Sequence, residues 1–240
     1  MRLSPQFYIW LNQTEGHMEK FEWTEGDTPN RFFIDPAGFV FVLPGAFLSI
    51  FFAVMAWSCL AIITVVLTAF CVFFFRDPRR PGPIDPKALV APADGRVIKV
   101  IENTTCPYLE GPCSQISIFM TVFNVHVNRS IVAGRVQKTL YHPGKFFAAN
   151  LDKASRENEH AAIYIEDSTG RLFCMVQVAG LIARRIICRI KEGDFLARGQ
   201  RFGVICFGSR LDIYLPASIV PTVSVGEKTR AGETTIGFLP

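Results

Sequence analysis

Hydrophobic residues are distributed unevenly along the chain, and the strongest feature is a long uncharged stretch. Residues 36–75 contain no Asp, Glu, Lys or Arg. A membrane-spanning helix needs roughly 20 apolar residues. The stretch therefore suffices for one generous span, or for two tight spans with a bend near Trp57, Ser58 and Cys59. It begins too far from the N-terminus for a signal peptide. We predict a membrane anchor over residues 36–75.

The flanks of this stretch indicate its orientation. Arg76, Arg79 and Arg80 follow it directly. By the positive-inside rule, the C-terminal part of the chain is expected on the cytoplasmic side of the cell membrane. Residues 76–86 are rich in proline, which cannot continue a helix, and are expected to form a linker. Residues 1–35 mix aromatic and charged side chains and are interpreted as a juxtamembrane segment.

From residue 87 onward the pattern changes to short apolar runs separated by turn residues, which is typical of strands. Strands are predicted at residues 96–102, 115–123, 134–141, 161–166, 172–178, 186–190, 202–207 and 211–215, and a helix only at residues 150–160. We expect residues 87–240 to form a mainly β domain. With its N-terminal helical segment, the whole chain is then of the α+β class.

A weak internal repeat refines this expectation. Residues 192–205 (EGDFLARGQRFGVI) and 225–238 (VGEKTRAGETTIGF) each carry two glycines at the same spacing, ahead of an apolar run. Such glycines suit two tight hairpins. The repeat, together with APADGRV at residues 91–97, resembles the barrel-sandwich domains of biotinyl and lipoyl carriers. We therefore expect a barrel-sandwich-like β domain.

Composition excludes several classes of function. Half of the residues are apolar and the net charge is only +4, without long charged runs, so nucleic-acid binding is not expected. The number of cysteines is seven and no C-x-x-C occurs, which favours a reducing compartment, with a Cys106–Cys113 bridge as the open alternative. The four histidines have no cysteine neighbours at ligand spacing, so no metal site is predicted.

Three places carry residues that are capable of chemistry. Gly208 and Ser209 lie between two apolar runs, where a plain turn is the simpler interpretation. His126, in FNVHVNRS, directly follows a predicted strand; imidazole titrates near neutrality and can carry protons, although a hydrogen-bonded structural histidine is the commoner case. Asp94 precedes a glycine, as turn aspartates often do. Taken one at a time, these residues do not define a function.

Four blocks considered together are more specific: FFRDPRRPGP with APADGRV, FMTVFNVHVNRSIVAGRV, YHPGKFFAANLDKASRENEH, and GLIARRIICRIKEGDFLARGQRFGVICFGSRLDIYLP. In this order, they resemble the short-form phosphatidylserine decarboxylases, from about residue 73 to residue 216. The resemblance implies a pyruvoyl-dependent enzyme that converts phosphatidylserine to phosphatidylethanolamine. It also implies a precursor cut between Gly208 and Ser209 into a β chain, residues 1–208, and an α chain, residues 209–240, that stay together.

The resemblance also implies roles for single residues. Ser209 attacks the Gly208 carbonyl and then becomes the pyruvoyl cofactor, whose carbonyl acts as the electron sink. His126 is the expected proton carrier, with Asp94 as its orienting partner. The longer bacterial enzymes have a second histidine where this chain has Arg129, so it stays open whether His126 serves self-cleavage, turnover or both.

Substrate contacts are less sharply indicated. Asn128, Arg129 and Lys145 are expected near the phosphate or carboxylate of a membrane phospholipid, since Arg and Lys commonly bind such groups. Arg184 and Arg185 are weaker candidates for contacts with the phosphate, and His142 is a lesser candidate for the catalytic histidine. Whether the protein is a homo-oligomer stays open.

Other functions compete with this interpretation. The main alternative is a membrane-tethered barrel-sandwich carrier or adaptor without activity, but the Met-Lys-Met triplet typical of carriers is absent. A second is a pyruvoyl decarboxylase of another substrate, either a serine lipid such as archaetidylserine or a small amino acid, although a membrane anchor disfavours the latter. A third is an inactive homologue, which an intact Gly208–Ser209 pair disfavours.

Overall fold

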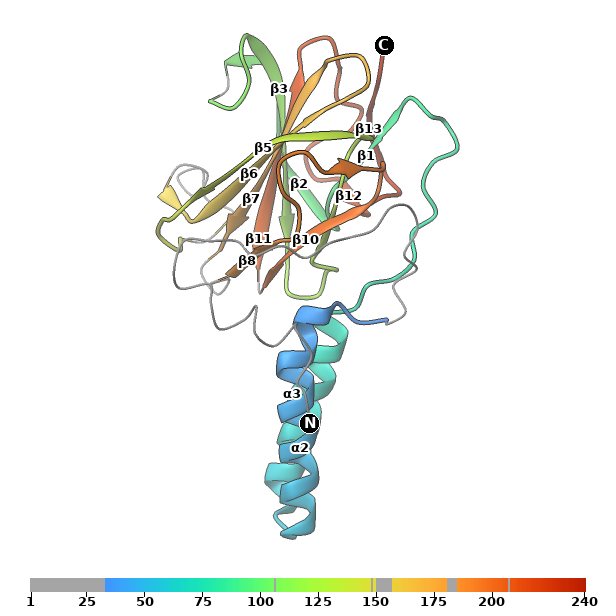
Figure 1. Ribbon diagram of the computed structural model, residues 1–240. Helices are drawn as coiled ribbons and strands as arrows, with labels where there is room; N and C mark the ends of the chain where they lie inside the picture. Colours follow the sequence, from blue (N-terminus) through green and yellow to red (C-terminus); the bar gives the residue numbers. More distant parts are fainter. Residues whose placement is uncertain (1–32, 106, 148, 150–156, 181–184, 207) are drawn as a thin grey trace.

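An apolar helical hairpin projects from one end of a β domain (Figure 1). The computed structural model describes residues 33–105, 107–147, 149, 157–180, 185–206 and 208–240. The helical elements are η1 (Pro36–Gly38), α2 (Phe39–Val54) and α3 (Ser58–Phe74). The strands are β1 (Ala88–Val90), β2 (Gly95–Thr105), β3 (Pro112–Met120), β4 (Val127–Arg129), β5 (Gly134–His142), β6 (His160–Glu166), β7 (Leu172–Ala179), β8 (Arg185–Cys188), β9 (Phe195–Leu196), β10 (Arg201–Cys206), β11 (Ser209–Pro216), β12 (Lys228–Thr229) and β13 (Thr235–Phe238).

The hairpin breaks at residues 55–57, directly before Ser58, at the end farthest from the β domain (Figure 1). Apolar side chains such as Phe47, Ile50 and Val66 cover its outer surface and are exposed. Pro36–Val54 is long and apolar enough to cross a membrane, whereas α3 has 17 residues. At 1.5 Å per residue α3 is about 25 Å long, against a hydrocarbon core of about 30 Å. The start of α2 and the end of α3 therefore lie at the same end of the hairpin, next to the β domain (Figure 1).

The strands form a strongly curved eight-stranded sheet and two smaller sheets. The order in the large sheet is β12-β2-β3-β11-β7-β6-β5-β9, and the smaller sheets are β4-β10-β8 and β1-β13. β11 lies inside the large sheet, antiparallel to β3 on one side and to β7 on the other. Its burial follows from this position, because both edges and both faces are covered.

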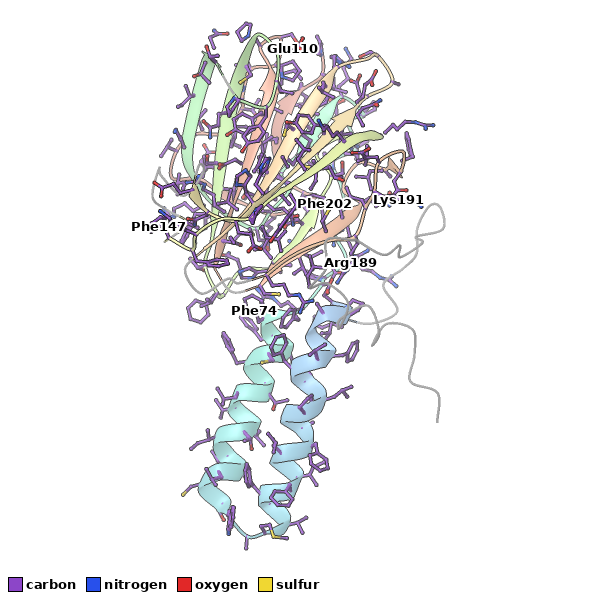
Figure 2. All side chains as sticks on the ribbon, turned by 60° about the vertical axis from the view of Figure 1, so that its left-hand side comes forward. Phe74, Glu110, Phe147, Arg189, Lys191 and Phe202 are labelled. Atoms are coloured by element: carbon purple, nitrogen blue, oxygen red, sulfur yellow. The ribbon has the colours of Figure 1, made fainter. Side chains whose placement is uncertain are left out.

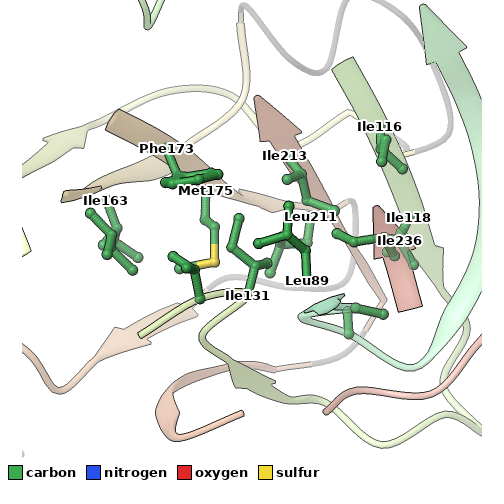
Figure 3. Close-up of a cluster of buried hydrophobic side chains, with 14 of the residues drawn as sticks. Leu89, Ile116, Ile118, Ile131, Ile163, Phe173, Met175, Leu211, Ile213 and Ile236 are labelled. Atoms are coloured by element: carbon green, nitrogen blue, oxygen red, sulfur yellow. The ribbon is translucent and has the colours of Figure 1, made fainter. Parts of the chain in front are cut away.

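The main hydrophobic core fills the space enclosed by these sheets (Figure 3). Alternate residues of β3 and β11 point into it, among them Ile116, Ile118, Leu211 and Ile213. Burying each such side chain contributes roughly 1.5–3 kcal/mol. A second cluster on the outer face of β7 and β11 contains Tyr214. The sheet is therefore covered on both faces around β11, which makes its first residue, Ser209, a rigid position.

The predicted fold class, a mainly β barrel-sandwich-like domain after an N-terminal helical segment, is confirmed. Some details were wrong. The strand predicted at residues 115–123 ends at Met120, and residues 121–126 form a turn held by Asn124. His160, assigned to a helix, begins β6, because it pairs with Val178 of β7. Within the same predicted helix, Asn158 forms an isolated β-bridge with Lys145, and residues 150–156 lie outside the described residues. Cys106 also lies outside them, so the alternative bridge stays a prediction.

The internal repeat is present, but not as two hairpins. Its glycines, Gly193 and Gly199 in the first copy and Gly226 and Gly232 in the second, all have positive φ. The flanking strands pair elsewhere: β9 with β5, β10 with β4 and β8, β12 with β2, and β13 with β1. Each repeat therefore makes a corner that carries the chain from one sheet to another.

Buried ion pairs join the hairpin to the β domain. Asp35, just before η1, makes two hydrogen bonds with Arg189, and Figure 2 shows Arg189 close to the end of the hairpin. Asp77, just after α3, binds Arg129 at 2.8 Å and also Arg201. The backbones of Asp35 and Phe75 are hydrogen bonded at 2.7 Å. The two ends of the hairpin are thereby fixed to each other and to the domain.

Candidate active site

Ser209 lies at the beginning of the central strand β11, immediately after a sharp turn. Gly208 has φ = +70°, a backbone conformation that residues with a side chain rarely adopt. Ser209 pairs with Met120 of β3 and with Ala179 of β7 and is completely buried. Its Oγ lies 3.9 Å from the Met120 sulfur. The Met120 sulfur is a weak acceptor, so this contact leaves the serine hydroxyl free to react.

The carbonyl oxygen of Gly208 fits against another glycine. A Cβ atom built on Gly180 would lie 2.3 Å from that oxygen, much closer than van der Waals contact allows. The approach follows from the register, because Gly180 follows Ala179, the partner of Ser209 across β7 and β11. Gly180 thus leaves space for the carbonyl that precedes Ser209. The sequence analysis missed this residue.

His126 occupies the end of the turn between β3 and β4, and its protonation state is well defined. Its Nδ1 lies 3.0 Å from the Asn124 carbonyl oxygen. A carbonyl only accepts, so Nδ1 carries the proton and Nε2 is the basic nitrogen. Nε2 is buried without a hydrogen-bond partner among the described residues. Burial lowers the pKa of His126 to about 4, with a smaller contribution from Arg76, although the bond to Asn124 acts in the opposite direction. A buried, neutral imidazole with a bare nitrogen can accept a proton.

The apolar hairpin packs against one side of His126. The ring of Phe74, the last residue of α3, stacks on His126 with centroids 4.1 Å apart. Phe74 also packs with Phe75 and with Cys206, three residues before Ser209. Figure 2 shows Phe74 where α3 meets the β domain. His126 and the turn before Ser209 therefore share one buried cluster at the end of the domain nearest the hairpin.

Asp94 is hydrogen bonded to other residues than His126, the partner expected from the sequence. One carboxylate oxygen accepts a hydrogen bond from Arg80 at 2.7 Å and the other from the Ala231 backbone N–H at 2.8 Å. The Nδ1 atom of His126 is bound to Asn124 instead. The structure thus ties Asp94 to the linker and to the turn before β13, and its orienting role stays a prediction.

The predicted substrate contacts divide into buried and exposed residues. Asn128 is buried beside the serine: its Nδ2 lies 3.8 Å from the Met120 sulfur that Ser209 also contacts. Its Oδ1 accepts from Gln177 at 2.8 Å. Gln177 was not predicted, although it is the one polar residue in the apolar run of β7. Asn128 and Gln177 are thus hydrogen bonded to each other beside Met120, the residue that Ser209 contacts.

Arg129 and Lys145 have other partners. Arg129 donates to Asp77, Pro78 and Gly199, so its guanidinium is occupied by the junction with the hairpin. Burial, followed by the charge of Arg201, lowers its pKa to about 10, which still leaves it charged at neutral pH. Lys145 is exposed and pairs with Glu157 at 3.2 Å.

The weaker candidates lie apart. His142 stacks on His160 at the end of β5, Arg185 begins β8, and Arg184 lies outside the described residues. No cluster of His, Cys, Asp and Glu that could hold a metal occurs among the described residues.

A buried serine after a glycine with positive φ, near an imidazole whose pKa is lowered, indicates an active site, and the adjacent apolar hairpin favours an enzyme that works at a membrane. Comparison with known proteins makes this specific. The family model for phosphatidylserine decarboxylase matches residues 67–237. The chain belongs to the phosphatidylserine decarboxylase family and is an enzyme of this type.

Relatives named phosphatidylserine decarboxylase proenzyme cover most of the chain. The protein of Geotalea uraniireducens is 50% identical over 203 residues, which are 85% of this chain and 95% of the relative. That of Nitratidesulfovibrio vulgaris is 53% identical over 77% of this chain and 85% of its own. That of Cupriavidus metallidurans is 53% identical over 72% and 80%. The enzymatic prediction is confirmed at the level of the family, and a carrier or adaptor without activity is set aside.

Proposed function

We propose that the chain is a proenzyme that cuts itself between Gly208 and Ser209 and then decarboxylates phosphatidylserine with the pyruvoyl group made from Ser209. The observation that carries the proposal is the turn before β11, where Gly208 with positive φ precedes a fully buried serine. The word proenzyme in the relatives' names supports processing of a precursor.

The chain's own residues account for the cut. The Oγ atom of Ser209 adds to the Gly208 carbonyl carbon while its proton passes to a base, and the peptide C–N bond breaks to leave an ester and a free amine. Loss of the Ser209 α-proton then expels the Gly208 carboxylate. The remaining unsaturated residue tautomerises to an imine, and water hydrolyses the imine carbon, which gives the pyruvoyl carbonyl and releases ammonia. Glycine suits the first step, because it presents no side chain to hinder attack and tolerates the turn.

His126 is the base that the geometry supports best. Its Nε2 is bare and its imidazole is neutral. For His126 to accept its proton, the Ser209 hydroxyl must exchange its contact with the Met120 sulfur for one with Nε2. Asn128 and Gln177 are placed to hold the polar groups of the site.

In turnover the pyruvoyl carbonyl supplies the electron sink for loss of carbon dioxide. The residues around it exclude water, since Ser209, Asn128 and Gln177 are all fully buried. After decarboxylation a proton must reach the α-carbon, and His126 is a titratable group at this end of the domain that can deliver it. The lipid approaches from the hairpin side, where Phe74 and the turn before Ser209 meet.

Intact-mass measurement tests the cut directly. Purified active protein is expected as two chains, Met1–Gly208 and Ser209–Pro240, the second blocked at its N-terminus. Ser209→Ala is expected to stay a single, inactive chain of 240 residues. A single unprocessed mass that accompanies full decarboxylase activity would overturn the proposal.

His126→Ala is expected to slow maturation, turnover or both by about 10²–10⁴-fold, because general acid–base help is worth that much. Processing is followed on a gel after cell-free synthesis, and turnover by release of carbon dioxide from phosphatidylserine. His17→Ala, which lies ahead of the hairpin in the sequence, is the control. Cleavage without turnover would assign His126 to turnover alone, and normal rates of both would remove it from the mechanism.

A further inference from the structure

The last residue of the membrane hairpin touches the proposed base. Phe74 is completely buried, and its ring lies parallel enough to His126 to count as stacked, with planes 29° apart. α3 ends at this residue, and Arg76, two residues later, donates to the backbone carbonyls of Phe73 and Phe123. Phe123 and His126 belong to the same turn between β3 and β4. The end of α3 and the histidine turn are therefore packed as one unit.

We propose that Phe74 is a positioning residue of the active site: its ring keeps water away from His126 and holds the imidazole, still neutral, in the orientation that serves Ser209. The membrane hairpin is then part of the catalytic machinery as well as an anchor. This inference rests on the proposed role of His126 as the base. It goes beyond that role, because it assigns the control of the base to a residue of the membrane segment.

Two observations point to an apolar cover as the means of control. The Nδ1 atom of His126 is bound to a neutral carbonyl of Asn124, which fixes the ring without adding charge. The Nε2 atom has no hydrogen-bond partner among the described residues, so the ring is screened from solvent rather than paired. An isolated polar atom of this kind is costly to bury, and it persists where it is used. Only the ring of Phe74 stacks on the imidazole among the described residues.

The charged and titratable groups around His126 are few. Arg76 follows α3 and acts on the imidazole in the same direction as burial, but less strongly. On β10, Cys206 packs against Phe74, and burial raises its thiol pKa to about 12, so it is neutral. Behind it, Asp35 and Arg189 neutralise each other as an ion pair. The apolar cover is therefore the feature to remove in a test.

The direct test measures the protonation of His126 in the intact precursor. The full chain is prepared as Ser209→Ala in lipid nanodiscs with ¹³C-labelled histidine, and the ring signals are followed between about pH 4 and 8. The His126 signal is identified by its loss in His126→Gln. We expect a midpoint near 4 for this parent, and a rise toward 6.5 in Phe74→Ala. Phe75→Ala is the matched control: it removes a ring of the same cluster that touches the edge of the Phe74 ring and stacks on Phe41 of α2, but does not stack on His126.

Two further variants sharpen the result. Phe74→Leu keeps part of the apolar cover and is expected to give a midpoint between those of the parent and Phe74→Ala. Misfolding of Phe74→Ala would change the signals of the other three histidines, and in that case Phe74→Leu replaces it in the test. Arg76→Gln is expected to move the midpoint less than Phe74→Ala, because burial is the larger cause. The inference is wrong if the parent already titrates near 6.5, or if Phe74→Ala and Phe75→Ala shift the midpoint equally.

Processing of the otherwise unchanged chain separates this inference from the proposed function. In Phe74→Ala, the acid limb of self-cleavage is expected to move upward with the midpoint, whereas in Phe75→Ala it stays. If His126→Ala is cleaved at the normal rate, the proposed base is wrong. If His126→Ala blocks cleavage while Phe74→Ala changes neither midpoint nor acid limb, the base assignment stands and the role of Phe74 is rejected.

Discussion

Two glycines in contact set the geometry at the proposed cleavage point. Gly180 leaves room for the Gly208 carbonyl oxygen, which a Cβ atom would approach to 2.3 Å. The chain cannot relieve this contact easily, since Ala179 and Ser209 are paired across two strands inside the sheet. Any side chain at residue 180 must therefore displace the carbonyl that Ser209 attacks.

We expect Gly180→Ala to fold but to accumulate uncut precursor. A displacement of about 1 Å in a reacting group costs roughly 100-fold in rate, and the loss is measured as the fraction of precursor on a gel over time. Gly82→Ala is the control, because a Cβ at Gly82 would make an ordinary 3.5 Å contact. Equal processing of both variants would show that the carbonyl is free to move.

The sequence placed Gly208, Ser209 and His126 in the candidate site, because they lie in local motifs that resemble those of the family. It did not point to Phe74, Gly180 or Gln177, which the structure adds to the candidate site. Phe74 is one of many phenylalanines in an apolar helix, and only long-range packing singles it out. The sequence did single out Asp94, but not its partners. Arg80 in the linker and Ala231 in the turn before β13 are far from Asp94 in the sequence, and only the tertiary fold brings them to it.

At the scale of elements, the hairpin and the β domain are joined by carboxylates at the two ends of the hairpin. The side chain of Asp77 is completely buried and forms ion pairs with two arginines, Arg129 from β4 and Arg201 from β10. β4 directly follows His126, and β10 leads to the turn before Ser209. A change at Asp77 therefore affects both halves of the site.

We expect Asp77→Asn to lower the thermal unfolding midpoint by several degrees. Removing one partner of a buried pair costs about 3–5 kcal/mol, because the other charge stays buried. Thermal unfolding of the purified protein in detergent measures the change. Glu157→Gln, which breaks the exposed pair with Lys145, is the control and is expected to cost at most about 1 kcal/mol. Matching midpoints for both variants would contradict a structural role of the junction.

The elements that the sequence predicted well are the long ones. The strands β3, β6 and β7 are buried on both faces over almost their whole length, so each stands out in the sequence as a mostly apolar run between turn residues. The short strands β1, β4, β9, β12 and β13 were missed, because two to four residues carry too little pattern. The repeat suggested hairpins, but the pairing partners of its strands are fixed by the tertiary fold, which a local pattern does not contain.

At the scale of the whole molecule, the site lies at the end of the domain that carries the hairpin (Figure 1). We therefore expect a substrate that resides in a membrane to approach Ser209 from this end of the domain. The arginines after α3 further support an orientation with the β domain on the cytoplasmic side.

We expect the protein to stay in the membrane fraction after extraction with alkaline carbonate, because the hairpin exposes a continuous apolar surface. Protease added to inverted membrane vesicles should digest the β domain, whereas right-side-out vesicles should protect it. The Ser209→Ala precursor serves as a control for changes that processing causes. Release by carbonate, or digestion from the outer side, would contradict this arrangement.

The position of β11 has a consequence for the lifetime of the protein. The segment after Gly208 contributes β11 and β12 to the large sheet and β13 to the pair with β1, so its strands are interleaved with those of the preceding segment. Before a cut, refolding is a unimolecular process that can be repeated. After it, the same interleaving must be rebuilt from two separate polypeptides, and the rate of recovery depends on concentration. Maturation would thus convert a reversible fold into a kinetically trapped one, whose first complete unfolding is also its last.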